Sequence, residues 1–507
     1  MNENLFETFR RGFPSDYGRV FLERPDGSMV SYGELLELSG RMARVLVDLG
    51  VQPGDRVAVQ VEKSAEALLV YLGALRAGAV YLPLNTAYTE GEVRYFLGDA
   101  EPSLFVCRPE QQSEVENVAR SVGVPQVLTL GERRDGSLWQ RVEAATAGDV
   151  VVQRSGDDLA AFLYTSGTTG RSKGAMLSHD NLASNAAALR DAWRFTAEDR
   201  LLHALPIFHT HGLFVATNIT LMAGGSMLFL PRFDLGEMMR LMPEATTMMG
   251  VPTFYTRLLS RPDLTRELVA HMRLFVSGSA PLSAETHKEF KERTGHAILE
   301  RYGMTETGMN TSNPYDGERI PGSVGKPLAG VELRIAEPAT GAVLPQGEIG
   351  VIEVRGPNVF KGYWRLPEKT AAEFRQDGFF ITGDLGHVDE RGYVYISGRG
   401  KDLIISGGFN VYPAEIEAAI DALPGVAESA VIGAPHPDFG EGVVAVVAPR
   451  PGAQLVPETM LADLARELAR YKLPKRLVVT IDLPRNAMGK VQKNILRDQH
   501  KASFQPT

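Results

Sequence analysis

The chain has 507 residues, of which 44% are hydrophobic and 23% charged, and this length predicts two or more domains. Its 62 acidic residues outnumber its 53 basic residues, and the formal charge of −9 excludes a global positive field for nucleic acid or an anionic membrane. Cys107 is the single cysteine, which excludes an intrachain disulfide framework and a paired-thiolate metal site. We therefore expect a reducing, cytoplasmic environment, with local cations wherever an anionic ligand binds.

Two segments were candidates for targeting or membrane insertion, and neither has the required composition. Residues 1–18 mix charged and aromatic side chains and lack the apolar core of a secretory signal. The most apolar stretch, residues 201–231, is interrupted by three histidines, a proline and three glycines, which a bilayer-spanning helix would tolerate poorly. We expect neither export nor a membrane span.

Helical and strand patterns alternate in the first part of the chain. Residues 32–50 are amphipathic, residues 56–61 are strand-like, and residues 65–77 are again helical. This alternation predicts parallel sheets covered by helices. The apolar run from Leu159 to Tyr164 predicts a further strand that leads directly into a small polar loop.

The pattern changes in the later part of the chain, where short extended segments follow one another. The predicted units are an antiparallel section at residues 331–355, a hairpin at 378–397, helices at 413–423 and 458–470, and strands at 429–433 and 443–448. The predicted fold class is α/β, with a large N-terminal domain of parallel and mixed sheets plus a small β-barrel-like section, followed by a small mobile α+β domain. We place these domains at residues 1–398 and 403–507, with a hinge at residues 399–402.

A loop of hydroxyl residues and glycines follows the strand that ends at Tyr164. It consists of Thr165, Ser166, Gly167, Thr168, Thr169 and Gly170. Hydroxyl and backbone donors on such a loop, with the cation of Lys173 nearby, suit a polyphosphate. The lysine stands three residues beyond the last glycine, so the loop differs from the P-loop pattern.

Five ordered motifs resemble those of the adenylate-forming superfamily, which includes acyl-CoA synthetases, luciferases and the adenylation domains of peptide synthetases. Besides the loop, they are YGMTE at residues 302–306, TGD at 382–384, GRGKD at 398–402 and PRNAMGK at 484–490. The resemblance covers nearly the whole chain. It implies an enzyme that joins a carboxylic acid to AMP and passes the acyl group to coenzyme A, with ATP and Mg²⁺ required.

The same resemblance implies roles around the nucleotide. Glu306 is expected to hold Mg²⁺, Thr305 to contact the α-phosphate, and Tyr302 to lie against the adenine. Asp384 is expected to accept the ribose hydroxyls, with Arg399 beside them. The remaining expected nucleotide contacts are Ser279, Ala280, Pro281, Glu300, Gly303 and Met304.

Lys490 is the predicted catalytic cation. Adenylation brings a carboxylate onto phosphorus, and an ammonium that bridges the two groups stabilises the transition state. The resemblance implies that rotation about Lys401 then replaces this face of the small domain by a second face, which approaches coenzyme A. The second face consists of Ser406, Gly407, Gly408 and Phe409. Acylation of Lys490 by a lysine acyltransferase is expected to switch the enzyme off, because it removes the charge.

The predicted acid is a small dicarboxylate, malonate, because an arginine precedes the tyrosine that covers the adenine. Residues 297–303 are strand-like, so Arg301 and Tyr302 point to opposite sides and Arg301 faces the acyl group. A buried guanidinium requires an anion, which the second carboxylate supplies. Further predicted contacts to malonate are His209, Thr210, Ser279 and Met304. In these positions the chain resembles malonyl-CoA synthetases.

Other interpretations stay open on the sequence alone. The acid is alternatively another small or methyl-substituted dicarboxylate, or a short monocarboxylate. A nucleotide-binding regulator without catalysis is a further alternative, although the presence of Lys490, Glu306 and Asp384 argues against it. The motifs do not exclude luciferase-type oxidation, and the sequence does not predict the oligomeric state.

Overall fold

The strands of the molecule form four sheets within the residues that the computed structural model describes, namely 2–149, 151–165, 172–406, 409–486 and 489–504. The largest sheet has the order β15-β14-β13-β12-β11-β9-β10-β1-β2. Its strands are β1 (Val20–Glu23), β2 (Met29–Ser31), β9 (Arg200–His203), β10 (Ser226–Phe229), β11 (Thr247–Gly250), β12 (Leu274–Ser277), β13 (Leu299–Met304), β14 (Gly308–Ser312) and β15 (Lys326–Pro327). Strands β10, β9, β11, β12 and β13 run parallel.

A second sheet, with the order β6-β5-β3-β4-β7-β8, confirms the predicted alternation. Its strands are β3 (Arg56–Gln60), β4 (Val80–Pro83), β5 (Leu104–Cys107), β6 (Val127–Thr129), β7 (Leu159–Thr165) and β8 (Lys173–Ser178). The two predicted helices are α2 (Tyr32–Asp48), which Ser31 caps, and α3 (Ala65–Ala77), which is buried along its whole length. Buried side chains of both sheets belong to one hydrophobic core, so the two sheets hold a fixed relation to each other.

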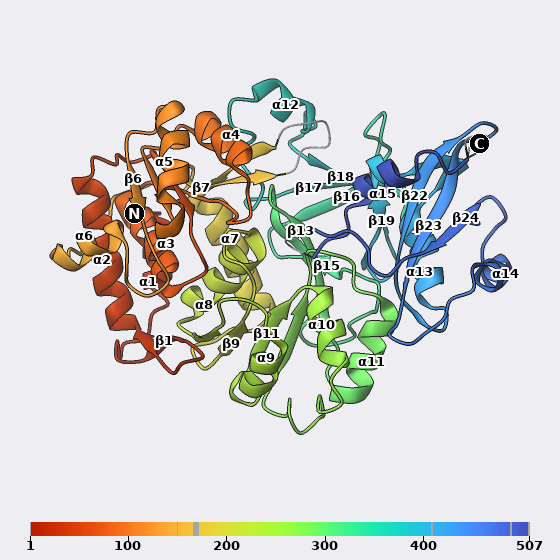
Figure 1. Ribbon diagram of the computed structural model, residues 1–507, viewed down its shortest axis with the longest axis horizontal. Helices are drawn as coiled ribbons and strands as arrows, with labels where there is room; N and C mark the ends of the chain where they lie inside the picture. Colours follow the sequence, from red (N-terminus) through yellow and green to blue (C-terminus); the bar gives the residue numbers. More distant parts are fainter. Residues whose placement is uncertain (1, 150, 166–171, 407–408, 487–488, 505–507) are drawn as a thin grey trace.

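The remaining helices of this part cover the sheets or connect their strands (Figure 1). They are α1 (Leu5–Arg10), α4 (Glu90–Ala100), α5 (Gln112–Ser121), α6 (Ser137–Ala144), α7 (His179–Ala192), α8 (Asn218–Ala223), α9 (Leu235–Leu241), α10 (Pro252–Leu259), α11 (Ala284–Thr294) and α12 (Pro367–Ala372). The segment η2 (His211–Thr217) is a π-helix, a rare form that often marks functional sites. In the part of the chain that the structure describes, no helix has both the length and the apolar composition needed to cross a bilayer.

Two antiparallel sheets follow, as the later sequence pattern predicts. The first contains β16 (Glu332–Ala336), β17 (Gly350–Arg355), β18 (Phe380–Val388) and β19 (Val394–Arg399). After the short turn η4 (Gly400–Asp402), the second contains β20 (Ile404–Ser406), β21 (Phe409–Val411), β22 (Val426–His436), β23 (Gly440–Pro449) and β24 (Arg476–Val479), with helices α13 (Pro413–Asp421), α14 (Pro457–Glu467) and α15 (Lys493–His500). This last unit has hydrophobic cores of its own and lies at the right of Figure 1. The domain limits at residues 398 and 403 stay a prediction.

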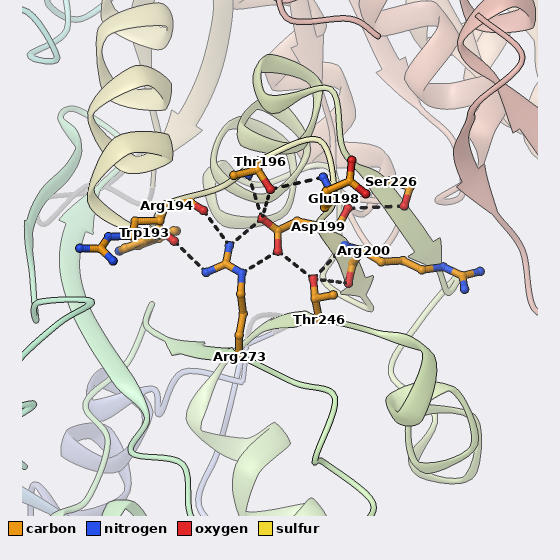
Figure 2. Close-up of polar contacts among 9 residues, drawn as sticks. All are labelled: Trp193, Arg194, Thr196, Glu198, Asp199, Arg200, Ser226, Thr246 and Arg273. Atoms are coloured by element: carbon orange, nitrogen blue, oxygen red, sulfur yellow. Dashed lines mark hydrogen bonds and ion pairs between the residues drawn. The ribbon is translucent and has the colours of Figure 1, made fainter. Parts of the chain in front are cut away.

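A polar network joins the amino ends of the parallel strands in the large sheet (Figure 2). Arg273, just before β12, donates to both carboxylate oxygens of Asp199, at 2.7 and 2.6 Å. The hydroxyl of Thr246, just before β11, donates to Asp199 at 2.8 Å, and the backbone N–H of Ser226 donates to the Asp199 carbonyl at 2.9 Å. Asp199 is only 3% exposed, and its charge is fully compensated. This network therefore stabilises the sheet.

Candidate active site

The predicted site residues of the large domain gather at the opposite, carboxyl ends of the same strands. There β9 ends at His203, β11 at Gly250 and β12 at Ser277, and β13 carries Arg301 and Tyr302. Ligands of parallel α/β sheets bind outside the carboxyl ends of the strands, because the backbone and the loops leave a crevice there. The sequence positions therefore converge where this fold places a ligand.

Arg301 is the most unusual side chain of this region. It is 3% exposed, and its Nε and Nη2 atoms have no hydrogen-bond partner among the described residues. Burial lowers the pKa of Arg301 to about 9, while Tyr255 and Glu300 oppose that shift, so the guanidinium stays charged at neutral pH. A buried charge without a partner is strongly unfavourable, and these donors are therefore suited to an anion.

Gly278 provides the space for this guanidinium. A Cβ atom at Gly278 would lie 2.4 Å from Arg301 Cζ and 2.6 Å from Arg301 Nε. Any side chain at this position would displace the guanidinium. Sequence reasoning assigned no role to Gly278, and the only signal was its place between two serines directly after an apolar strand.

Three consecutive residues bring further unpaired polar atoms to the same place. His209 Nδ1, Thr210 Oγ1 and His211 Nε2 lack hydrogen-bond partners within the described residues. Burial, followed by the positive charges of Arg301 and Lys490, lowers the pKa of His209 to about 4, so its imidazole is neutral. His211 Nδ1 lies 3.2 Å from the hydroxyl of Ser279, a residue in the left-handed region with φ of 72°. The neighbouring residues Ala280 and Pro281 lie on the same turn before α11.

A second group of residues lies around Asp384. Tyr302 donates its hydroxyl to Asp384 Oδ2 at 2.6 Å, and Arg399 Nε lies 3.2 Å from Asp384 Oδ1. Asp384 and Arg399 are paired across β18 and β19. The three predicted nucleotide residues are therefore in direct contact, although they span 97 positions of the chain.

Lys490 enters this site from the small domain. Burial, followed by repulsion from Arg399, lowers the pKa of Lys490 to about 8, while Asp384 opposes that shift. The positive charge of Lys490 also contributes to the lowered pKa of His209. The residue as a whole remains exposed, so water reaches the Lys490 side chain.

Glu306 lies buried in a third group, beside Lys173. Its Oε1 atom accepts hydrogen bonds from Tyr363 at 3.0 Å and from Thr165 at 3.3 Å. Burial raises the pKa of Glu306, and the charge of Lys173 partly opposes this. Lys173 forms an ion pair with Glu373 at 3.2 Å and lies 3.9 Å from the centre of the Tyr363 ring. Sequence reasoning missed Tyr363, and no motif distinguished it.

The other predicted nucleotide residues lie on or next to β13. Glu300 accepts the Leu282 N–H at 3.2 Å, and burial raises the pKa of Glu300 to about 8. Gly303 is packed so closely that a Cβ atom there would lie 2.1 Å from the Gly308 carbonyl oxygen. Met304 and Thr305 are half-buried in and directly after β13.

The predicted coenzyme A face and hinge belong to the small domain and the turn before it. Ser406 is buried, and Phe409 is exposed and stacks on Tyr471 at 4.7 Å between ring centres. Lys401 lies in η4, and burial lowers its pKa. The remaining predicted residues lie outside the described part of the chain: Ser166, Gly167, Thr168, Thr169, Gly170, Gly407 and Gly408.

Known proteins match the chain over its whole length. A family model described as AMP-binding enzyme matches residues 9–364, and a model of the AMP-binding enzyme C-terminal domain matches residues 415–490. A malonate–CoA ligase of Arabidopsis thaliana is 34% identical over 97% of this chain and 89% of its own length. The mitochondrial malonate–CoA ligase ACSF3 of Mus musculus is 35% identical over 92% and 86%, respectively.

Solved structures also match this chain over its whole length. ATP-bound MatB from Rhodopseudomonas palustris is 60% identical, covers 100% of both chains, and superposes with a TM-score of 0.97. The apo form of the same protein, with the same identity and coverage, superposes with a TM-score of 0.87. The arrangement of the chain described above is therefore closer to that of the ATP-bound relative.

Proposed function

This chain belongs to the AMP-binding enzyme family, and from that premise we propose that it converts malonate, ATP and coenzyme A into malonyl-CoA, AMP and pyrophosphate. The observation that carries the choice of acid is Arg301, whose buried guanidinium has two atoms without hydrogen-bond partners among the described residues. A second carboxylate, as in malonate, pairs with such a fork in a bidentate manner. A monocarboxylate would leave the buried charge unpaired. The similarity to malonate–CoA ligases of a plant and a mammal supports the same acid.

The acyl pocket holds malonate by both ends. Arg301 binds the distal carboxylate above Gly278, while neutral His209 and the hydroxyls of Thr210 and Ser279 complete the polar wall. Met304 borders the methylene. The distal end is then fixed, so the reacting carboxylate points toward the nucleotide and Lys490.

The first half-reaction forms malonyl-AMP. An oxygen of the reacting carboxylate attacks the α-phosphorus of ATP, and the bond from that phosphorus to the pyrophosphate oxygen breaks. Lys490 lies between the two negative groups and stabilises the charge that develops there. Thr305 contacts the α-phosphate, Asp384 and Arg399 orient the ribose, and Tyr302 covers the adenine. The remaining nucleotide contacts are Lys173, Ala280, Pro281, Glu300 and Gly303, together with the phosphate loop from Thr165 to Gly170.

Mg²⁺ fits the environment of Glu306. This carboxylate is buried, and no cationic side chain of the described residues lies within ion-pair distance of it, so a hard cation with oxygen ligands suits it. When bound together with the phosphate oxygens, the ion neutralises part of their charge. Tyr363 and Thr165 orient the Glu306 carboxylate for that role.

The second half-reaction transfers the acyl group. The thiolate of coenzyme A attacks the acyl carbon, and the bond to the AMP phosphate oxygen breaks. Rotation about Lys401 moves Lys490 away and brings Ser406, Gly407, Gly408 and Phe409 to the site. The different TM-scores to the ATP-bound and apo forms of one relative support a movable arrangement of the two domains.

A substrate panel tests this function. Purified enzyme is incubated with ATP, Mg²⁺, coenzyme A and one acid at a time, and thioesters are quantified by mass spectrometry. Malonate is expected to give the highest kcat/KM, with methylmalonate next and butyrate and acetate far behind. A higher value for acetate or butyrate in the parent enzyme would leave only the general acyl-CoA ligase assignment.

We propose a reducing compartment as the cellular setting. Cys107 is buried and free, which supports a reducing compartment such as the cytoplasm.

Lys490 is exposed, and a lysine acyltransferase that modified it would remove the catalytic charge. Enzyme carrying acetyl-lysine at position 490, made by chemical or genetic incorporation, is expected to lose adenylation, and full activity would exclude this form of regulation.

A further inference from the structure

A buried lysine–histidine pair lies behind the acyl pocket, and none of the steps above uses it. Lys63 lies just beyond β3 of the second sheet, and His203 ends β9 of the large sheet, so the pair bridges the carboxyl ends of two sheets. Lys63 Nζ lies 3.0 Å from His203 Nδ1 and donates to the His203 carbonyl at 2.8 Å. Lys63 is 8% exposed and His203 is 1% exposed. Burying a lysine costs free energy, so this pair is an unusual feature of the fold.

The partners of the two ring nitrogens fix the imidazole of His203 in one tautomer. Among the described residues, Lys63 has no carboxylate within ion-pair distance, and its Nζ lies 4.2 Å from the centre of the Phe229 ring. The Gly212 carbonyl oxygen, 2.9 Å from His203 Nε2, can only accept, so the imidazole proton resides on Nε2 and His203 Nδ1 accepts from Lys63. Burial, followed by the charge of Lys63, lowers the pKa of His203, which agrees with a neutral ring.

The other ring nitrogen of His203, Nε2, contacts the π-helical segment η2. This atom lies 2.9 Å from the Gly212 carbonyl oxygen, which also accepts the Thr217 hydroxyl at 2.9 Å. A Cβ atom at Gly212 would lie 2.0 Å from the Pro206 carbonyl oxygen, so the backbone here is packed without spare room. Because Gly212 directly follows residues 209–211, its carbonyl fixes the end of the segment that carries His209, Thr210 and His211.

We propose that Lys63 and His203 are positioning residues that set the affinity for the distal carboxylate of the acid. They act through the Gly212 carbonyl, which holds His209, Thr210 and His211 beside Arg301. This inference rests on the proposed function, because it concerns the same acyl pocket. Neither residue touches the substrate, so their effect is on KM for the dicarboxylate rather than on the chemical step.

The test uses Lys63→Met and His203→Leu in the full-length enzyme. Each variant breaks the series of polar contacts that runs from Lys63 through His203 to the Gly212 carbonyl, and each keeps a side chain of similar size. KM for malonate is expected to rise about tenfold, while KM for ATP and the kcat/KM for butyrate change less than about twofold. The double variant is expected to resemble each single variant, because both break one chain of contacts. Thr246→Val, in the network of Figure 2, is the matched control and is expected to lower Tm without raising KM.

Specific outcomes overturn the inference. An unchanged KM for malonate in a folded variant contradicts it. An equal rise of KM for malonate and ATP together with a lower Tm shows a merely structural role and also contradicts it. If Lys63→Met does not fold, Lys63→Gln, which retains an N–H donor, is expected to fold with a KM between those of the parent and His203→Leu, and any other order contradicts the inference. A parent enzyme that prefers butyrate to malonate overturns the proposed function instead, and this result does not depend on the variants.

Discussion

Two arginines lie near opposite ends of strand β12, half-buried Arg273 just before it and buried Arg301 on the neighbouring strand β13, and they differ in their partners. Near the amino end, Arg273 binds both oxygens of Asp199 and donates to two backbone carbonyls, at 3.0 and 3.1 Å (Figure 2). Beyond the carboxyl end, Arg301 lies against Gly278 and has two guanidinium nitrogens without partners in the described residues. The same residue type therefore stabilises the fold where its charge is matched internally, and our proposal assigns it to a ligand where it is not.

Removal of Lys490 should produce the largest effect on the rate of adenylation. We expect Lys490→Ala to reduce malonyl-AMP formation about 10³-fold, because the variant loses the cation between the two reacting anions. Thioester formation from supplied malonyl-AMP should be nearly unchanged. Rapid-quench measurement of each half-reaction checks both statements. Lys493→Ala, which breaks an ion pair with Glu417 in the same domain, is the control and should leave adenylation intact; equal loss of both half-reactions in Lys490→Ala would contradict the account.

Arg273→Met should affect stability instead of catalysis. It leaves the Asp199 carboxylate buried with fewer donors, and we expect a loss of about 3 kcal/mol in the free energy of unfolding. Urea denaturation measures this change. KM values for malonate and ATP should stay within about twofold of the parent values. A variant with full stability and a raised KM for malonate would remove the distinction between the two arginines.

Arg301→Met should show the opposite combination. We expect kcat/KM for malonate to fall about 10²-fold, because a desolvated charge pair with the substrate is lost. The melting temperature should be unchanged or raised, since the variant removes a buried charge two of whose nitrogens have no hydrogen-bond partner among the described residues. Differential scanning fluorimetry and steady-state kinetics on the same preparation give both values. A lower melting temperature with unchanged malonate kinetics would assign Arg301 to the fold.

The pH dependence of adenylation should report Lys490. By our proposal its ammonium is the active form, and its pKa is lowered to about 8, so kcat/KM should be constant below about pH 7, fall about tenfold per unit between pH 8 and pH 9, and fall more steeply above the Arg301 pKa of about 9. In Lys490→Arg the overall rate should be lower, but the falling limb should move up by about one unit, toward the pKa of Arg301 at about 9. Single-turnover rates from pH 6 to pH 10 measure the limb. The same limb in both enzymes would exclude Lys490 as its source.

Gly278→Ala should produce the smallest effect in this series. Its Cβ atom would collide with the Arg301 guanidinium, which must then shift from its position over the backbone. We expect KM for malonate to rise about tenfold, with little change in KM for ATP. Gly322→Ala is not a suitable control because that glycine has positive φ, whereas Gly91→Ala lies in open space on α4 and should leave both KM values unchanged. Unchanged malonate kinetics in Gly278→Ala would remove the proposed role of this glycine.

Much of the architecture could be predicted because its signals are local. The periodic patterns predicted α2, α3, β3 and β7 with errors of at most two residues, and those of the later part predicted the small α+β unit. The opposite directions of the Arg301 and Tyr302 side chains could also be predicted, because side chains alternate along one strand. The family motifs added the nucleotide residues.

The rest of the site depends on contacts between distant positions. Arg273 and Asp199 are 74 residues apart, and Lys63 and His203 are 140 residues apart. A single sequence does not show that one arginine meets a carboxylate and the other a glycine backbone. The role of Gly278 likewise depends on the tertiary position of Arg301.

The central claim is that the Arg301 guanidinium recognises the second carboxylate of the acid. The most direct measurement is the ratio of kcat/KM for malonate to that for 3-methylbutyrate, a monocarboxylate whose uncharged isopropyl group replaces the second carboxylate of malonate, in the parent enzyme and in Arg301→Met. The account predicts a ratio far above one in the parent and a fall of at least about 10²-fold in the variant, with the variant as stable as the parent. An unchanged ratio in a stable Arg301→Met variant would contradict it.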